Sequence, residues 1–256
     1  MATLVCCPQS SRGEWRFRLF GVFVRVKFWF WITILILGGD KLAVDALTWV
    51  AVCFASILLH ELGHVFAFRM FGRDAEVVLY GWGGMAIPRG AVSGTLGRFV
   101  VALAGPAAGF CVVGLVLAAA KFSGAHIITS FHLGIPILLV MPNWTGDVPP
   151  YLRESYHWYT LLNDLLFVNF YWGLVNLLPV LPLDGGHAAQ ALFEQYDPFR
   201  GRRMSLILSA AVAGVVVVLG IVTYNFYLVL MFAILAVSSL QWLDGARQRE
   251  AYRSAR

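Results

Sequence analysis

The chain has 256 residues, of which 59% are hydrophobic and 13% are charged, whereas about 25% of the residues in an ordinary soluble domain are charged. This composition excludes a soluble globular protein and predicts a polytopic membrane protein. The formal net charge of +5 does not indicate nucleic-acid binding, because the basic residues lie in short tails and loops beside apolar runs.

Six apolar runs are long enough to cross a hydrocarbon core about 30 Å thick. They lie near residues 22–39, 44–70, 97–121, 157–195, 204–222 and 225–243. The fourth run is interrupted. The segment 126–142 is shorter and broken by prolines, so we interpret it as an interfacial or re-entrant loop. The sequence therefore predicts an all-α polytopic membrane protein with about six transmembrane helices.

The distribution of Lys and Arg orients these six spans. With a cytoplasmic N-terminus, sixteen of the 19 basic residues fall on the cytoplasmic side and only Lys41, Lys121 and Arg153 fall on the other. A seventh span at 126–142 would put the arginines at 200–203 on the wrong face. We therefore expect an integral protein of the cell membrane with both termini in the cytoplasm.

The first run could also belong to a cleaved signal peptide, because a basic region precedes FWFWITILIL and AVDA at 43–46 resembles a cleavage site. The second run follows almost at once, which favours an uncleaved span.

The four cysteines have neither metal-site nor disulfide spacing. We expect a single membrane-embedded domain over 1–256, with a core at 20–195 and two further spans at 204–243.

The second run contains LLHELGH at 58–64. His60 and His64 are four residues apart, so on a helix their imidazoles share one face and can converge on one ion. Glu61 can reach a water held on that ion. This H-E-x-x-H spacing is typical of zinc hydrolases in which the glutamate is the general base. A chance match is disfavoured, because each ionisable group within a span costs about 2.5 to 3.5 kcal/mol even on lenient scales.

A catalytic zinc ordinarily has three protein ligands and one open position. The extended motif with a third histidine is absent, since Ala67 and Met70 occupy the relevant positions. Asp74 and Glu76 follow in a polar segment that we expect to be a solvated loop. The other acidic residue in deeply apolar surroundings is Asp184, within NLLPVLPLDGGH at 176–187.

The segment around Asp184 predicts a broken helix. Pro179 and Pro182 remove backbone donors, while Gly185 and Gly186 permit conformations closed to other residues. Broken backbone at membrane depth is tolerated where it is buried in protein or lines a wet cavity. Asp184 would then begin a resumed helix.

Two polar residues flank this break. Asn176 carries an amide that could donate to a developing oxyanion or hold the substrate backbone, with a helix-packing amide as the alternative. His187 lies three residues beyond Asp184 and could face the same cavity. We interpret it as a supporting or packing histidine, with a direct ligand as the alternative.

Together, HELGH in the second run and NLLPVLPLDGG in the fourth resemble the site-2 protease family of intramembrane zinc metalloproteases. The resemblance covers roughly residues 20–195, and AGPAAG at 104–109 is similar to the Gly-Pro element of the family's third core helix, where small residues allow close packing. It implies that His60, His64 and Asp184 are zinc ligands, Glu61 the general base and Asn176 a substrate or transition-state contact.

The segment AEVVLYGWGGMAIP at 75–88 alternates strand-like pieces with glycines. The resemblance implies a membrane-associated β-hairpin or sheet here, between the second and third spans. Its edge strand could pair with an unwound substrate segment, and a surface hairpin is the alternative. The sequence contains no recognisable PDZ-like domain or CBS pair.

The leading hypothesis is a zinc endopeptidase that cleaves a membrane-spanning protein substrate in regulated intramembrane proteolysis. One alternative is a catalytically silent homologue that acts as a binding partner, although the retained base and ligands argue against it. Another is a metal or ion transporter that uses ionisable groups near the membrane midplane. A transporter would carry ion flux and tolerate Glu61→Gln. The sequence predicts no oligomeric state.

Overall fold

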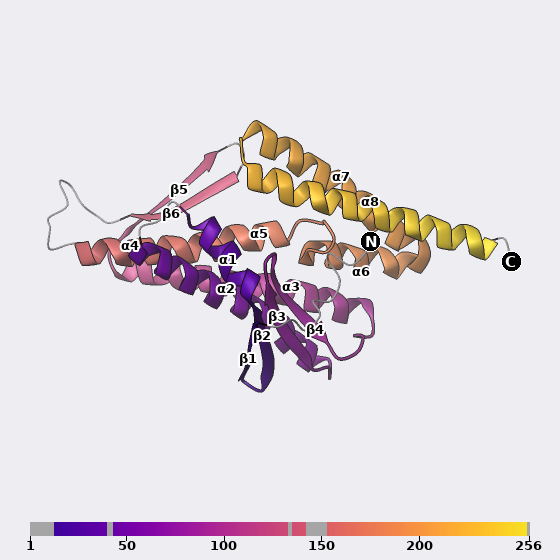
Figure 1. The fold of residues 1–256 in the computed structure, drawn as a ribbon, viewed down its shortest axis with the longest axis horizontal. Helices are drawn as coiled ribbons and strands as arrows, with labels where there is room; N and C mark the ends of the chain where they lie inside the picture. The colour runs from indigo at the N-terminus through magenta and orange to yellow at the C-terminus, as the bar shows by residue number, and fades with distance from the viewer. Residues whose placement is uncertain (1–12, 40–42, 133–134, 142–152, 255–256) are drawn as a thin grey trace. The chain divides into compact units, whose positions relative to one another are not determined.

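The computed structural model of the chain describes residues 13–39, 43–132, 135–141 and 153–254 (Figure 1). The chain forms two compact units. The first comprises Met1–Ala91 and Ala104–Gly173, and the second comprises Val92–Leu103 and Leu174–Arg256. The described residues are mostly helical and include a small four-stranded sheet and a separate hairpin.

The sheet of the first unit contains β1 (Glu14–Leu19), β2 (Val22–Lys27), β3 (Ala75–Tyr80) and β4 (Gly83–Pro88) in that order. β2 pairs parallel with β3, and the other two pairings are antiparallel. Val22, Val24 and Val26 are buried and alternate with less buried neighbours, as expected of a strand with one covered face. The prediction that the first span begins at residue 22 is therefore wrong.

Four helices among the described residues are long and apolar enough to cross a membrane. They are Val44–Met70, Thr95–Phe122, Arg200–Val222 and Phe226–Gly245. The first predicted span contributes only the ten-residue helix α1 (Phe28–Leu37). The fourth is divided into α4 (Arg153–Leu166), the π-helical segment η2 (Phe167–Tyr171), α5 (Trp172–Asn176) and α6 (Asp184–Tyr196). The interruption of the fourth run is confirmed, whereas the count of six spans stays a prediction.

The segment 126–142 is not a loop but a hairpin of β5 (His126–His132) and β6 (Ile135–Met141). Pro136 lies next to the start of β6, a position that a strand tolerates. The side-chain amide of Asn163 on α4 accepts from the Val140 amide at 2.8 Å and donates to its carbonyl at 2.9 Å. This pairing attaches β6 to α4. The polar stretch 143–152 lies outside the described residues.

The core of the first unit forms where α2 (Ala43–Met70) packs against the sheet and against α4. Trp49 on α2 is buried and donates its indole N–H to the Ile34 carbonyl of α1 at 2.9 Å. α2 is therefore packed against α1, the sheet and α4.

The second unit consists of α6, α7 (Pro198–Val222) and α8 (Phe226–Ser254), together with the chain that precedes α6 and the first turns of α3 (Thr95–Phe122). α7 and α8 run side by side, drawn in orange and yellow in Figure 1. Val180, Ala213 and Phe232 are fully buried in their core. The chain just before α6 is therefore part of the same packed core as the two C-terminal helices.

Candidate metal centre

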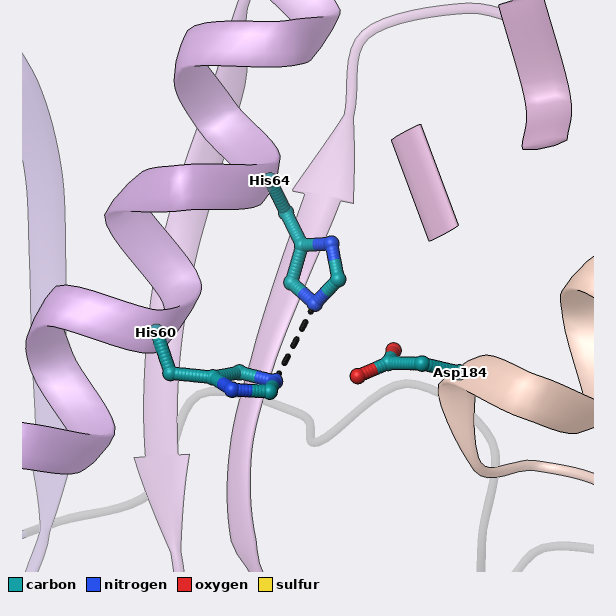
Figure 2. Close-up of side chains that lie close together, drawn as sticks. All are labelled: His60, His64 and Asp184. Carbon is teal, nitrogen blue, oxygen red and sulfur yellow. Dashed lines mark hydrogen bonds between the residues drawn. The ribbon is translucent and has the colours of Figure 1, made fainter. Parts of the chain in front are cut away.

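His60 and His64 lie on consecutive turns of α2 and are only 6% and 7% exposed. Their Nε2 atoms point toward each other at 3.2 Å (Figure 2). Two imidazoles on one tetrahedral zinc, with Zn–N distances of 2.0–2.1 Å, place their nitrogens about 3.3 to 3.4 Å apart. The pair therefore has the spacing of two ligands that share an ion.

Gly105 on α3 keeps the space beside these two nitrogens open. A Cβ atom at this position would lie 2.7 Å from Nε2 of His60 and closer still to Nε2 of His64. Gly63 on α2 is likewise packed against the Ala104 carbonyl, where a Cβ would lie at 2.6 Å. The AGPAAG segment therefore permits close approach of α3 to α2, and one of its glycines leaves room at the candidate ligands.

Glu61 is 5% exposed and lies against β4. A Cβ atom at Gly84 would lie 2.5 Å from both Cγ and Oε1 of Glu61. The strand can pass this close to the carboxylate only because residue 84 has no side chain. Gly84 and Gly105 thus adjoin the candidate site residues, and the sequence marked them only as small residues in a strand-like piece and in a helix.

Asp184 is the first residue of α6 in the second unit and is half-buried. The break before it, residues 177–183, is a tight turn in which the Leu183 amide donates to the Val180 carbonyl at 2.7 Å. The predicted broken and resumed helix is confirmed.

The reason for the two glycines after Asp184 differs from the predicted one, since neither Gly185 nor Gly186 has a positive φ. Both are closely packed instead. A Cβ at Gly185 would collide with the Leu177 carbonyl, and one at Gly186 would lie 2.5 Å from the Val180 carbonyl carbon. The glycines therefore let α6 begin directly against the turn that precedes it.

The other predicted residues differ in their surroundings. Asn176 ends α5, is half-buried, and makes no side-chain hydrogen bond to another described residue. His187 is exposed on α6.

Asp74 is exposed, with Arg69 at 3.4 Å. Glu76 is not in a loop, because it lies on β3 and pairs with Arg25 of β2 at 2.8 Å.

As a donor set, His60, His64 and Asp184 could form a metal site (Figure 2). Two imidazole nitrogens and one carboxylate oxygen are ligands that zinc accepts, and three protein ligands leave a fourth position open, as in catalytic zinc sites. The residues present therefore fit a zinc ion.

Residues 48–223, about two thirds of the chain, match Peptidase family M50, and the chain belongs to that family. A solved structure titled Site-2 Protease from Methanocaldococcus jannaschii has the same fold, with a TM-score of 0.57 and 20% identity over 90% of this chain and 95% of that one. The resemblance to site-2 proteases is confirmed. Family membership and the four long apolar helices together make this an integral membrane protein.

Curated relatives carry related names. A zinc metalloprotease of Methanocaldococcus jannaschii is 24% identical over 224 residues, which cover 84% of this chain and 56% of the relative. Rip3, a candidate zinc metalloprotease of Mycobacterium tuberculosis, is 33% identical over 138 residues, which cover 54% of this chain and 28% of the relative. The chain thus spans about half of the first relative's length and less than a third of the second's.

Proposed function

We propose that this protein is an intramembrane zinc metalloprotease that hydrolyses peptide bonds within or near transmembrane segments of other proteins, in regulated intramembrane proteolysis. One observation carries the proposal. A buried pair of imidazole nitrogens 3.2 Å apart, with a buried glutamate beside the first histidine, lies within an apolar helix long enough to span a membrane. The family and the names of the relatives support the same chemistry.

His60 and His64 would hold the zinc through Nε2, and the carboxylate of Asp184 would be the third protein ligand. Bound zinc lowers the pKa of a coordinated water and polarises the carbonyl of the scissile peptide. Gly105 supports this role because it leaves the space beside both nitrogens free.

Glu61 would accept a proton from the attacking water and return it to the leaving nitrogen. Its position supports this role, because the carboxylate is buried and faces the backbone of β4 rather than bulk solvent. Asn176, whose amide is not engaged by another described side chain, would donate a hydrogen bond to the scissile carbonyl oxygen as negative charge develops there.

The substrate would bind as an extended segment along β4. A transmembrane helix hides its carbonyls in internal hydrogen bonds, so hydrolysis requires local unwinding. β4 pairs with β3 and ends the described sheet, which leaves its other edge available to an added strand. Since Gly84 of this strand adjoins Glu61, a peptide paired there would run close to the general base.

We also propose one catalytic domain with six spans, embedded in the cell membrane with both termini cytoplasmic. The sixteen-to-three distribution of basic residues supports this orientation. Reporter fusions at the two termini and within 72–96 should report from the cytoplasm, and a fusion at 143–155 should report from the opposite side. An external C-terminus would contradict the six-span arrangement.

The decisive experiment compares the wild type with Glu61→Gln in lipid vesicles that contain a membrane-spanning reporter. Glutamine keeps the shape of the side chain but cannot accept the proton, so cleavage should fall about 10² to 10⁴-fold while zinc content is unchanged. Asp74→Asn, the same acid-to-amide change at an exposed position, should cleave normally.

Three results would contradict the proposal in different ways. Near-normal cleavage by zinc-loaded Glu61→Gln would refute the role of the base. A wild type that binds zinc and the reporter without cleaving it would favour a silent homologue. Zinc flux into the vesicles that persists in Glu61→Gln would favour a transporter.

A further inference from the structure

A continuous chain of hydrogen bonds joins the turn before Asp184 to the two C-terminal helices of the second unit. The Leu181 amide donates to Oγ of Ser209 on α7 at 2.8 Å, and Ser209 Oγ lies 2.8 Å from Oγ of Ser239 on α8. Ser239 donates to the Leu235 carbonyl at 2.9 Å. Because the Ser239 proton is used there, Ser209 is the donor to Ser239.

This chain satisfies a buried backbone donor that the turn cannot satisfy by itself. Leu181 stands between Val180 and Pro182, is 5% exposed, and lies outside any helix. Both serines are 0% exposed. A buried amide without an acceptor costs about 1 to 3 kcal/mol, so Ser209 stabilises this conformation of the turn over others.

The conformation of residues 177–183 determines where α6 begins. Val180 is fully buried against Ala213 and Phe232, and the backbone at Gly186 rests on the Val180 carbonyl carbon. The Leu181 amide is three residues before Asp184. A shift of the turn therefore moves the first residue of α6, which is Asp184.

We propose that Ser209, oriented by Ser239, is a positioning residue for the metal ligand Asp184, so that α7 and α8 contribute to zinc affinity without touching the ion. This inference rests on the proposed function, in which Asp184 binds zinc. Groups that orient a metal ligand typically change metal affinity about 10 to 100-fold when removed.

The alternative is that the two serines only join α7 to α8, as small polar residues often do between membrane helices. The two readings differ in which serine matters. If the serines serve helix packing alone, Ser209→Ala and Ser239→Ala should have equal effects. If Ser209 holds the turn, Ser209→Ala should be the more severe, because Ser239→Ala leaves the acceptor of the Leu181 amide in place.

The test uses the full-length protein with Ser209→Ala, Ser239→Ala and the control Ser205→Ala. Ser205 is 2% exposed on the same helix, and its hydroxyl donates to the Arg202 carbonyl of its own turn at 2.8 Å. Zinc affinity is measured by competition with a chelator. Backbone hydrogen exchange over 177–186 is measured on the zinc-free protein, with exchange in α7 and α8 as the check of folding.

Ser209→Ala should lower zinc affinity about 10 to 100-fold and accelerate exchange at 177–186, with smaller changes in Ser239→Ala and none in Ser205→Ala. Unchanged zinc affinity in a folded Ser209→Ala protein would overturn the proposal, even if exchange accelerates. Equal effects of Ser209→Ala and Ser239→Ala would also overturn it, because helix packing alone predicts that result. A wild type that binds no zinc would instead refute the proposed function, and the exchange data would still decide whether Ser209 holds the turn.

Discussion

α2 carries two candidate ligands on consecutive turns of an unbroken 28-residue helix, whereas Asp184 follows a break at residues 177–183. The separation of His60 and His64 is set by helical pitch and needs only the helix to form. The position of Asp184 depends on a turn whose amide is held by Ser209, 28 residues further along the chain. His60 and His64 are thus positioned by local helix geometry, and we call them the local half of the candidate site. Asp184 depends on tertiary contacts, and we call it the tertiary half.

The largest expected effect is loss of zinc on removing a ligand. His60→Ala, His64→Ala and Asp184→Ala should each reduce bound zinc by more than the roughly 10 to 100-fold expected for losing a group that merely orients a ligand. Metal analysis of the purified proteins measures this. Unchanged zinc in Asp184→Ala would show that Asp184 is not a ligand. α2 would then bind the ion without the turn at 177–183, and the contrast between the two regions would not apply to the metal site.

The local half of the candidate site could be predicted from the sequence. Four-residue spacing places His60 and His64 on one helix face whatever the rest of the chain does, and Glu61 follows from the same motif. The break before Asp184 was also predictable, because prolines remove donors. The contact of the Leu181 amide with Ser209 was not, since nothing local distinguishes Ser209 from the other serines of α7 and α8.

The incorrect span and the unrecognised glycines have different causes. Residues 22–27 were assigned to a span because they continue into FWFWITILIL, although the alternation of Val22, Val24 and Val26 was a strand signal. The roles of Gly84 and Gly105 depend on side chains of another element, which no spacing rule brings near them. Local pattern predicts an element, but it does not predict what packs against it.

A smaller loss is expected at the amide beside the break. Asn176→Ala should lower kcat about 10² to 10³-fold with zinc content unchanged, because a donor to a developing oxyanion acts only in the transition state. Asn225→Ala is the control, since Asn225 Oδ1 accepts from the exposed Leu228 amide. Loss of zinc in Asn176→Ala would assign the residue to the turn that positions Asp184, and normal turnover would leave it no role in catalysis.

The next effect in size is expected at Gly105, where an added side chain would press on the imidazoles of His60 and His64. Gly105→Ala places a Cβ atom within 2.7 Å of His60 Nε2, so the imidazoles must move, and a misplacement of about 1 Å can lower activity about 10²-fold. Gly114→Ala on the same helix is the control, because its Cβ would meet no atom within 4 Å. Equal activities of the two variants would show that the imidazoles adapt, and that the local half is less rigid than its helix.

The smallest expected effect lies at the far end of α6. Arg98 pairs with Glu194 at 2.5 Å, and Gln190 donates to the same carboxylate at 2.6 Å, so α6 has a polar anchor ten residues beyond Asp184. The Arg98 side chain is 39% exposed, and exposed ion pairs contribute only about 0.2 to 1 kcal/mol. Arg98→Gln should therefore leave zinc affinity within a factor of a few of the wild type.

The reason for expecting so little is that an outer anchor and an inner one act on different ends of the helix. The turn at 177–183 is held within a buried core, and the start of α6 rests directly on it, so loss of the ion pair lets the distal end move without displacing Asp184. Zinc competition on Arg98→Gln, with Glu194→Gln as the reciprocal variant, measures this. A 10-fold loss of zinc affinity in both variants would show that contacts at the far end of α6 position Asp184. The hydrogen bond from the Leu181 amide to Ser209 would then not be the contact that determines the position of this ligand.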